Sequence, residues 1–222
     1  MSSAKKKLIM ACCCGGEVIE FLNAAWSQDF LATAAGYGEV TPPDVPDGTT
    51  FDEAWGRCFG EGSYDMNIGP QQFGLNWMDN ITFGGPERYY LNGYARYGSL
   101  DTSSLASASA ATLKVTPSDA GGNNWSSTVS IGVRVRSSAF TGTWATMLTE
   151  GEDVGEFDTT GDGTLENLVL PAAAVAEINL TGTTYFAFYI TKTTKPSDPG
   201  EDQFYRRKID FSLQLDVTGT LD

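Results

Sequence analysis

The sequence contains no histidine and few basic residues, and both absences limit what the protein can do. Histidine is the usual general base and a frequent zinc ligand, so its absence excludes Ser-His-Asp and Cys-His catalysis. Asp and Glu number 28 against 14 Lys and Arg, which gives a formal net charge of −14. Because such a surface repels phosphate backbones and anionic lipids, we expect binding neither to nucleic acid nor to membranes.

Long apolar runs are also missing. The run that follows the basic start is four residues long, from Leu8 to Ala11, whereas a signal peptide needs about 7–15 apolar residues. We therefore expect no lipid anchor at Cys12. No run approaches the roughly 20 apolar residues of a transmembrane helix, so we expect no membrane span.

Cysteine is scarce but clustered: three of the four cysteines are adjacent, at Cys12, Cys13 and Cys14. In an extended chain Cys12 and Cys14 project to one side, and together with Cys58 they give one thiolate fewer than a closed zinc site requires. Neighbouring cysteines rarely bridge each other, although a disulfide to Cys58 or to another chain stays open. We expect the three to pack as small apolar side chains.

Residues 1–85 read as an N-terminal docking and assembly arm. Apolar residues recur at helical spacing from Ile19 to Phe30 and predict one helix over 17–35. Three prolines in 38–50 predict an irregular loop, and the glycine- and aromatic-rich stretch 51–90 predicts loops with isolated short strands. Because this arm holds more aromatic side chains than it can bury alone, we expect it to lie on a partner surface. The candidate anchors are Trp26, Trp55, Phe59, Phe73 and Trp77.

Residues 86–222 read as a mainly β domain. Alternating or continuously apolar runs predict strands over 89–97, 111–116, 127–137, 183–191 and 208–217. The run 183–191 is apolar on both faces and should be a central strand. A short alanine-rich helix is expected with Pro171 at its first helical position. Several strands separated by turn clusters are typical of an antiparallel β-sandwich or jelly roll.

The segment 158–163, DTTGDG, is the strongest motif for a metal. Asp158, Thr160 and Asp162 have the alternate spacing of calcium-loop ligands, and Gly163 permits the sharp turn. The bidentate acid of such loops is missing, since Val169 occupies its position. An acidic β-turn explains the same residues, so calcium is a candidate and no cofactor is certain.

Two other groups of residues are candidates for a catalytic or a binding site. Acidic residues crowd between Glu150 and Glu166, and a carboxylate-only hydrolase would need two of them held across a cleft. Trp144 and the tyrosines at 89, 90, 94 and 97 could stack on sugar rings, or could instead be half-buried core at a sheet edge. Nothing in the sequence pairs the acids, so we expect no enzyme.

Several segments resemble the jelly-roll β-sandwich modules called DNRLRE-like. These are YYLNGYARYGSLDTSSLASASAATLKV, then FTGTWAT, then LPAAAVAEINLTGTTYFAFYI, and the resemblance covers residues 86–217. Such modules occur in structural proteins of tailed bacteriophages and in bacterial surface proteins. The resemblance implies a fold and not an activity.

These observations together favour a bacteriophage virion accessory protein. The arm would dock on other virion proteins and on sister copies, and an acidic sandwich would project from the outer surface of the virion as capsid decoration, neck or tail component. The alternative is a carbohydrate-binding or adhesin module for host-surface glycans, with Trp144 in its site.

Overall fold

The computed structural model describes the chain in segments. The backbone is described for residues 7–9, 17–22, 25–33, 65–67, 74–81, 88–121, 128–140, 149–193 and 203–222. Side chains are described for residues 18–22, 97–121, 128–140, 149–193 and 208–222. No helix in these segments is both long and apolar enough to cross a membrane.

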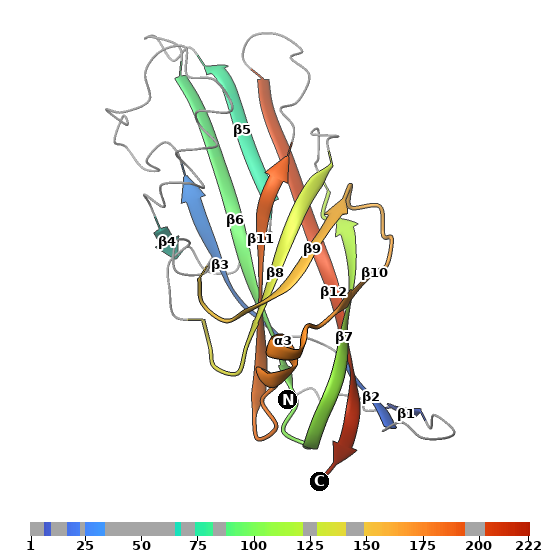
Figure 1. The fold of residues 1–222 in the computed structure, drawn as a ribbon. Helices are drawn as coiled ribbons and strands as arrows, with labels where there is room; N and C mark the ends of the chain where they lie inside the picture. The colour runs from blue at the N-terminus through green and yellow to red at the C-terminus, as the bar shows by residue number, and fades with distance from the viewer. Residues whose placement is uncertain are drawn as a thin grey trace.

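Two layers of antiparallel strands make up this part of the chain (Figure 1). Sheet A contains β1 (Lys7–Ile9), β2 (Glu17–Leu22), β7 (Leu105–Asp119), β10 (Glu166–Val169) and most of β12 (Gln203–Leu221). Sheet B contains β3 (Ala25–Thr33), β4 (Asp65–Asn67), β5 (Gly74–Ile81), β6 (Arg88–Asp101), β8 (Val129–Arg136), β9 (Glu152–Thr159) and β11 (Thr183–Thr193).

The strand order is that of a jelly roll. Sheet A runs β2–β12–β7–β10, and sheet B runs β6–β11–β8–β9. Among these eight strands, those that follow one another along the chain lie in opposite sheets, except for β8 and β9, as in two interlocked Greek keys. The long strand β12 also pairs with β5 through its first residues and so joins both layers (Figure 1). The predicted mainly β sandwich is confirmed.

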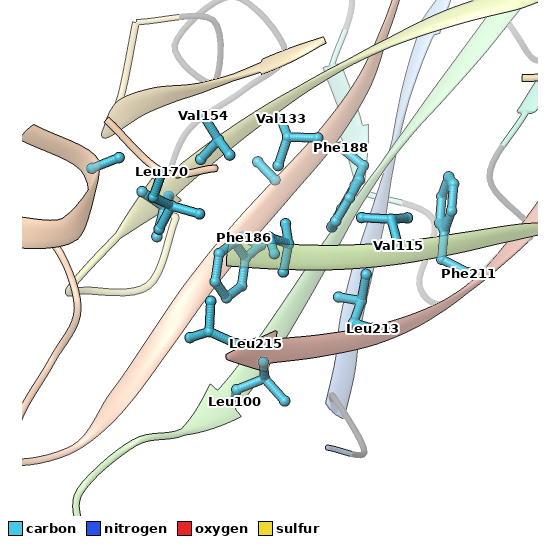
Figure 2. Close-up of a cluster of buried hydrophobic side chains, with 14 of the residues drawn as sticks. Leu100, Val115, Val133, Val154, Leu170, Phe186, Phe188, Phe211, Leu213 and Leu215 are labelled. Carbon is cyan, nitrogen blue, oxygen red and sulfur yellow. The ribbon is translucent and has the colours of Figure 1, made fainter. Parts of the chain in front are cut away.

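The core lies between the two sheets. Phe186 and Phe188 of β11 are fully buried, and Figure 2 shows them facing the side chains that β7 and β12 contribute from sheet A. The rings of Phe188 and Phe211 stack at a centroid distance of 5.1 Å, which places an aromatic contact across the layers. Burying each such ring removes apolar surface from water and stabilises the fold by about 1.5–3 kcal/mol.

Most sequence expectations for the back of the chain are confirmed. Val129, Ile131, Val133 and Val135 of β8 are all fully buried, as their alternation predicts. Strand β11 lies between β6 and β8 and is therefore internal to its sheet. The alanine-rich helix is α3 (Ala172–Ala176), although Pro171 occupies its N-cap and not its first helical position.

The helix predicted over 17–35 is wrong, because this stretch forms the strands β2 and β3 instead. The segment EVIEFL fits the period of a helix as well as that of a strand. Ile19 and Leu22 are three residues apart, as on one face of a helix, whereas Ile19 and Phe21 are two apart, as on one face of a strand. Phe21 pairs with Leu215 of β12, and Ile19 and Phe21 are both buried. Pairing with a distant strand decided between the two periods.

The sandwich uses strands from both sides of residue 85. Strand β2 lies beside β12, and β5 lies between β12 and β6. Docking of the front segment on a partner stays a prediction. The side chains of its candidate anchors, Trp26, Trp55, Phe59, Phe73 and Trp77, lie outside the described residues, as do the three adjacent cysteines.

Candidate functional site on the outer face of sheet B

The outer face of β11, β8 and β9 carries large polar and aromatic side chains. Because Phe186 and Phe188 point into the core, Tyr185 and Tyr189 point outward from the same strand. Antiparallel pairing places Tyr189 beside Gly132, and Gly132 beside Glu156. We call this surface the tyrosine face and define it by Tyr185, Tyr189, Arg134, Asp153 and Glu156.

The ring of Tyr189 lies across strand β8, over Gly132. A Cβ atom built on Gly132 would lie 2.6 Å from Cζ and 2.8 Å from the hydroxyl oxygen of Tyr189. A side chain at this position would displace the ring, so glycine is what lets the end of the Tyr189 ring lie over β8. Tyr189 is only partly buried, so its ring is held in place and still reaches solvent.

Arg134 lies beside this ring and is held by the backbone of a neighbouring loop. Its Nε donates to the carbonyl oxygen of Glu150 at 2.9 Å, and its Nη2 donates to that of Gly151 at 2.7 Å. Arg134 also hydrogen-bonds to Tyr189. Arg136 forms an ion pair with the Glu150 carboxylate at 2.6 Å. The two arginines therefore fix the end of the loop that returns to β9.

Tyr189 remains protonated at neutral pH. Burial raises the pKa of its hydroxyl above the ordinary 10.0, Asp153 and Glu156 raise it further, and Arg134 opposes them. Thr191 donates to Oε2 of Glu156, so this carboxylate is tied to β11 across the intervening strand. The face therefore presents a neutral hydroxyl donor near side-chain carboxyl groups that can accept hydrogen bonds.

Two irregularities in the strands flank Tyr189. The register of β11 with β8 shifts between Ile190 and Lys192, and that of β8 with β9 shifts between Val133 and Arg134. Gly155 lies at the second shift with φ +134°, a conformation that favours glycine. Bulges redirect side chains and increase twist, and they are over-represented next to functional sites.

The residues of the predicted calcium loop engage in separate contacts. The Asp158 carboxylate accepts a 2.5 Å hydrogen bond from the Ser130 hydroxyl. The Asp162 carboxylate accepts from the Thr164 N–H at 3.0 Å, and this bond is the main cause that lowers the pKa of Asp162. Gly163 N–H donates to the Pro117 carbonyl and so fastens the turn to β7.

Across the segments described, no group of three or more Cys, His, Asp or Glu residues is placed to hold a metal ion. Thr160 is exposed at the end of β9, between the two aspartates in sequence. Calcium binding by Asp158, Thr160 and Asp162 stays a prediction.

The sequence placed the glycan-stacking residues elsewhere. Tyr97 is 3% exposed and stacks on Phe140 at a centroid distance of 4.9 Å, so of its two expected roles the structure supports a core position and not an exposed platform. Trp144, and the side chains of the tyrosines at 89, 90 and 94, lie outside the described residues. Tyr185 and Tyr189 were missed because 183–191 reads as apolar on both faces. The sequence did hold one signal for this site: Gly132 occupies an outward position of β8, where the regular alternation otherwise places polar side chains.

Comparisons with known proteins assign no family. No family model and no curated protein match the chain. One similar solved structure is a proposed secreted protein of Parabacteroides distasonis ATCC 8503, with 9% identity, a TM-score of 0.30, and coverage of 98% of this chain and 87% of that one. Another is a carbohydrate-binding module of a β-sandwich superfamily, with 10% identity, a TM-score of 0.23, and coverage of 97% and 95%. At these TM-scores neither likeness supports a function.

Proposed function

We propose that this protein is a non-enzymatic virion accessory protein whose jelly roll binds host-surface glycans through the tyrosine face. One observation carries the glycan part: the end of the Tyr189 ring lies over Gly132, and Glu156 is the cross-strand neighbour of Gly132. Binding sites for small polar ligands combine aromatic surface with a few oriented polar groups. A sugar ring has an apolar C–H face that fits an aromatic ring, and hydroxyls that fit a carboxylate.

The rigidity of the face also supports binding. Strands β11, β8 and β9 are packed on the common core, and Arg134 is fixed by two backbone carbonyls. A site of this kind loses little conformational entropy when a ligand binds, because its side chains are already placed. The tyrosine face is therefore suited to a weak ligand that is displayed in many copies.

The glycan part is tested by calorimetry with glycans that a glycan array first selects, using the full chain. We expect Tyr189→Ala to weaken binding about tenfold or more, as truncation of a central aromatic contact does. Thr116→Ala, on the outer face of sheet A, is the matched control and should bind normally. If Tyr189→Ala keeps its circular dichroism spectrum and its full affinity, the tyrosine face is not the site. Loss of binding only in Trp144→Ala would place the site in the 141–148 segment.

The virion part rests on the sequence resemblance over residues 86–217 and on the aromatic content of residues 1–85. Its test is mass spectrometry of gradient-purified virions from lysates that express the chain. We expect the chain in the particle fraction, and an antibody against the jelly roll should label the particle surface in electron micrographs. Recovery only in the free protein fraction would contradict this setting without bearing on glycan binding.

A further inference from the structure

We infer that the tyrosine face binds an extended, unbranched oligosaccharide that lies along β11 and contacts Tyr185 and Tyr189 with different sugar units. This inference rests on the proposed glycan binding and adds the shape and the length of the ligand. Its basis is the second tyrosine of the face, Tyr185, which points outward from the same strand four positions before Tyr189.

The fold holds the two tyrosines at a fixed separation. The register of β11 is regular with β8 from Tyr185 to Ile190, and with β6 from Tyr185 to Phe188. Because a regular strand rises about 3.3 Å per residue, the two side chains leave the sheet about 13 Å apart. Both are partly buried and pack against the core. A single sugar ring cannot reach both tyrosines, whereas a chain of several sugars can.

Strand β11 places no large side chain between the two tyrosines. The outward position between them is Ala187, which is fully buried. Its cross-strand neighbours are Tyr97 of β6 and Arg134 of β8, and both are far larger than its methyl group. Nothing that β11 itself contributes therefore rises between the two aromatic rings, so one ligand can follow the strand from the first ring to the second.

The two tyrosines offer unequal subsites. Tyr189 hydrogen-bonds to Arg134, so at this ring aromatic surface is combined with an oriented polar group. The cross-strand neighbour of Tyr185 is Arg136, whose guanidinium is paired with the Glu150 carboxylate. We therefore assign the first sugar contact to Tyr189 and a second, mainly aromatic contact to Tyr185. Only a ligand long enough to reach both gains from the second contact, by roughly three- to tenfold in affinity.

The test is calorimetric titration of the full chain with two oligosaccharide series, each from the disaccharide to the hexasaccharide. Cello-oligosaccharides have β-linkages and form straight chains, whereas malto-oligosaccharides have α-linkages and form curved chains. We expect the affinity for the straight series to rise roughly three- to tenfold where the chain first spans about 13 Å, and then to level off. The curved series should show no such rise. Should the glycan array select another unbranched chain, its own length series replaces the cello-oligosaccharides with the same expectation.

Matched variants assign the rise to the second tyrosine. Tyr185→Ala should remove the rise with chain length and leave the affinity for the disaccharide unchanged. Tyr185→Phe keeps the ring and should retain the rise. If the circular dichroism spectrum shows that Tyr185→Ala does not fold, Tyr185→Leu takes its place, because leucine keeps apolar volume at this position without a flat ring. A rise that persists without the ring would overturn the inference.

The remaining outcomes separate this inference from the function on which it rests. Affinity that is independent of chain length, yet still lost in Tyr189→Ala, would overturn the extended ligand and keep glycan binding. An array that selects only branched or compact glycans would do the same. Failure of every glycan on the array to bind would overturn both.

Discussion

The two outer faces of the sandwich cover the same core but differ in what they present. On sheet A the outward positions of β7 and β12 alternate through small and charged residues, namely Thr112, Lys114, Thr116, Ser212, Gln214 and Asp216. Among the described residues of that sheet, none of the outward side chains is aromatic. On sheet B two tyrosines, a glycine and two arginines occupy the equivalent outward positions.

The need to keep a sheet surface in water explains the side chains on the outer face of sheet A but not those on the outer face of sheet B. Short hydroxyl and charged side chains are enough to keep a sheet surface in water, and Ser107 and Thr220 simply hydrogen-bond to one another at 2.8 Å. A tyrosine that requires a glycine on the next strand is a more specific arrangement, because glycine weakens a strand interior. The comparison therefore supports the proposal that recognition occurs on sheet B, and the following experiments test that proposal.

The largest effect is expected from a substitution in the core that lies beneath both faces. Phe188→Ala deletes a fully buried ring that stacks on Phe211 of the opposite sheet. We expect the free energy of unfolding to fall by about 3–5 kcal/mol, since the cavity adds to the lost burial. Urea denaturation measures it, with the outward-facing, partly buried Thr116→Ala as control. A loss below about 1 kcal/mol would mean that this contact does not hold the layers together.

The packing of this core could largely be predicted from sequence, and the site could not. Val129 to Val135 alternate over a run long enough to fix a strand and its buried side. The segment with Ile19 and Phe21 is too short to choose its own period, and its partner Leu215 lies almost the whole chain away. Non-local pairing of this kind leaves no local signal.

The same limit applies to the tyrosine face. Alternation with Phe188 and Ile190 already implies that Tyr189 points outward. What makes it a candidate site is the register that puts Gly132 under its ring, and register between distant strands is set by the tertiary fold. Residues whose role depends on a cross-strand neighbour are therefore the ones that sequence analysis overlooks.

A smaller loss of stability is expected from a substitution at the contact between Gly132 and Tyr189, which distinguishes sheet B from sheet A. Gly132→Ala would place Cβ against Cζ of Tyr189, so the ring must move off the sheet. We expect about 1–3 kcal/mol of lost stability, as for other overpacked sites, together with weaker glycan binding. Thermal unfolding and calorimetry measure the two effects.

A double-mutant cycle shows whether the ring is the cause. If Gly132→Ala acts through Tyr189, adding Tyr189→Ala should recover part of the lost stability, with a coupling of about 0.5–3 kcal/mol. Purely additive effects would show that the glycine serves the backbone instead, and the comparison between the faces would lose its main support.

The pH dependence of stability isolates Tyr189 itself. The pKa of its hydroxyl is raised above 10.0 in the folded protein, chiefly by burial. The folded state then holds a proton that the unfolded state has lost, so this contribution is complete below about pH 10 and disappears as the pH rises through the folded pKa. Wild-type stability should thus fall more steeply above about pH 10 than that of Tyr189→Phe. Parallel curves in alkaline urea melts would show that the hydroxyl is not buried.

The smallest effect is expected on sheet A. Lys114 Nζ lies 2.6 Å from the Asp216 carboxylate, which Gln214 also contacts at 2.6 Å, and all three side chains lie on the outward face. Since the pair is partly exposed, Lys114→Met should cost only about 0.2–1 kcal/mol and less in high salt. It should leave glycan affinity unchanged, whereas Arg134→Met on sheet B should reduce it. Equal effects of the two variants on binding would mean that the faces are not functionally distinct, because only the general charge of the molecule would then be acting on the ligand.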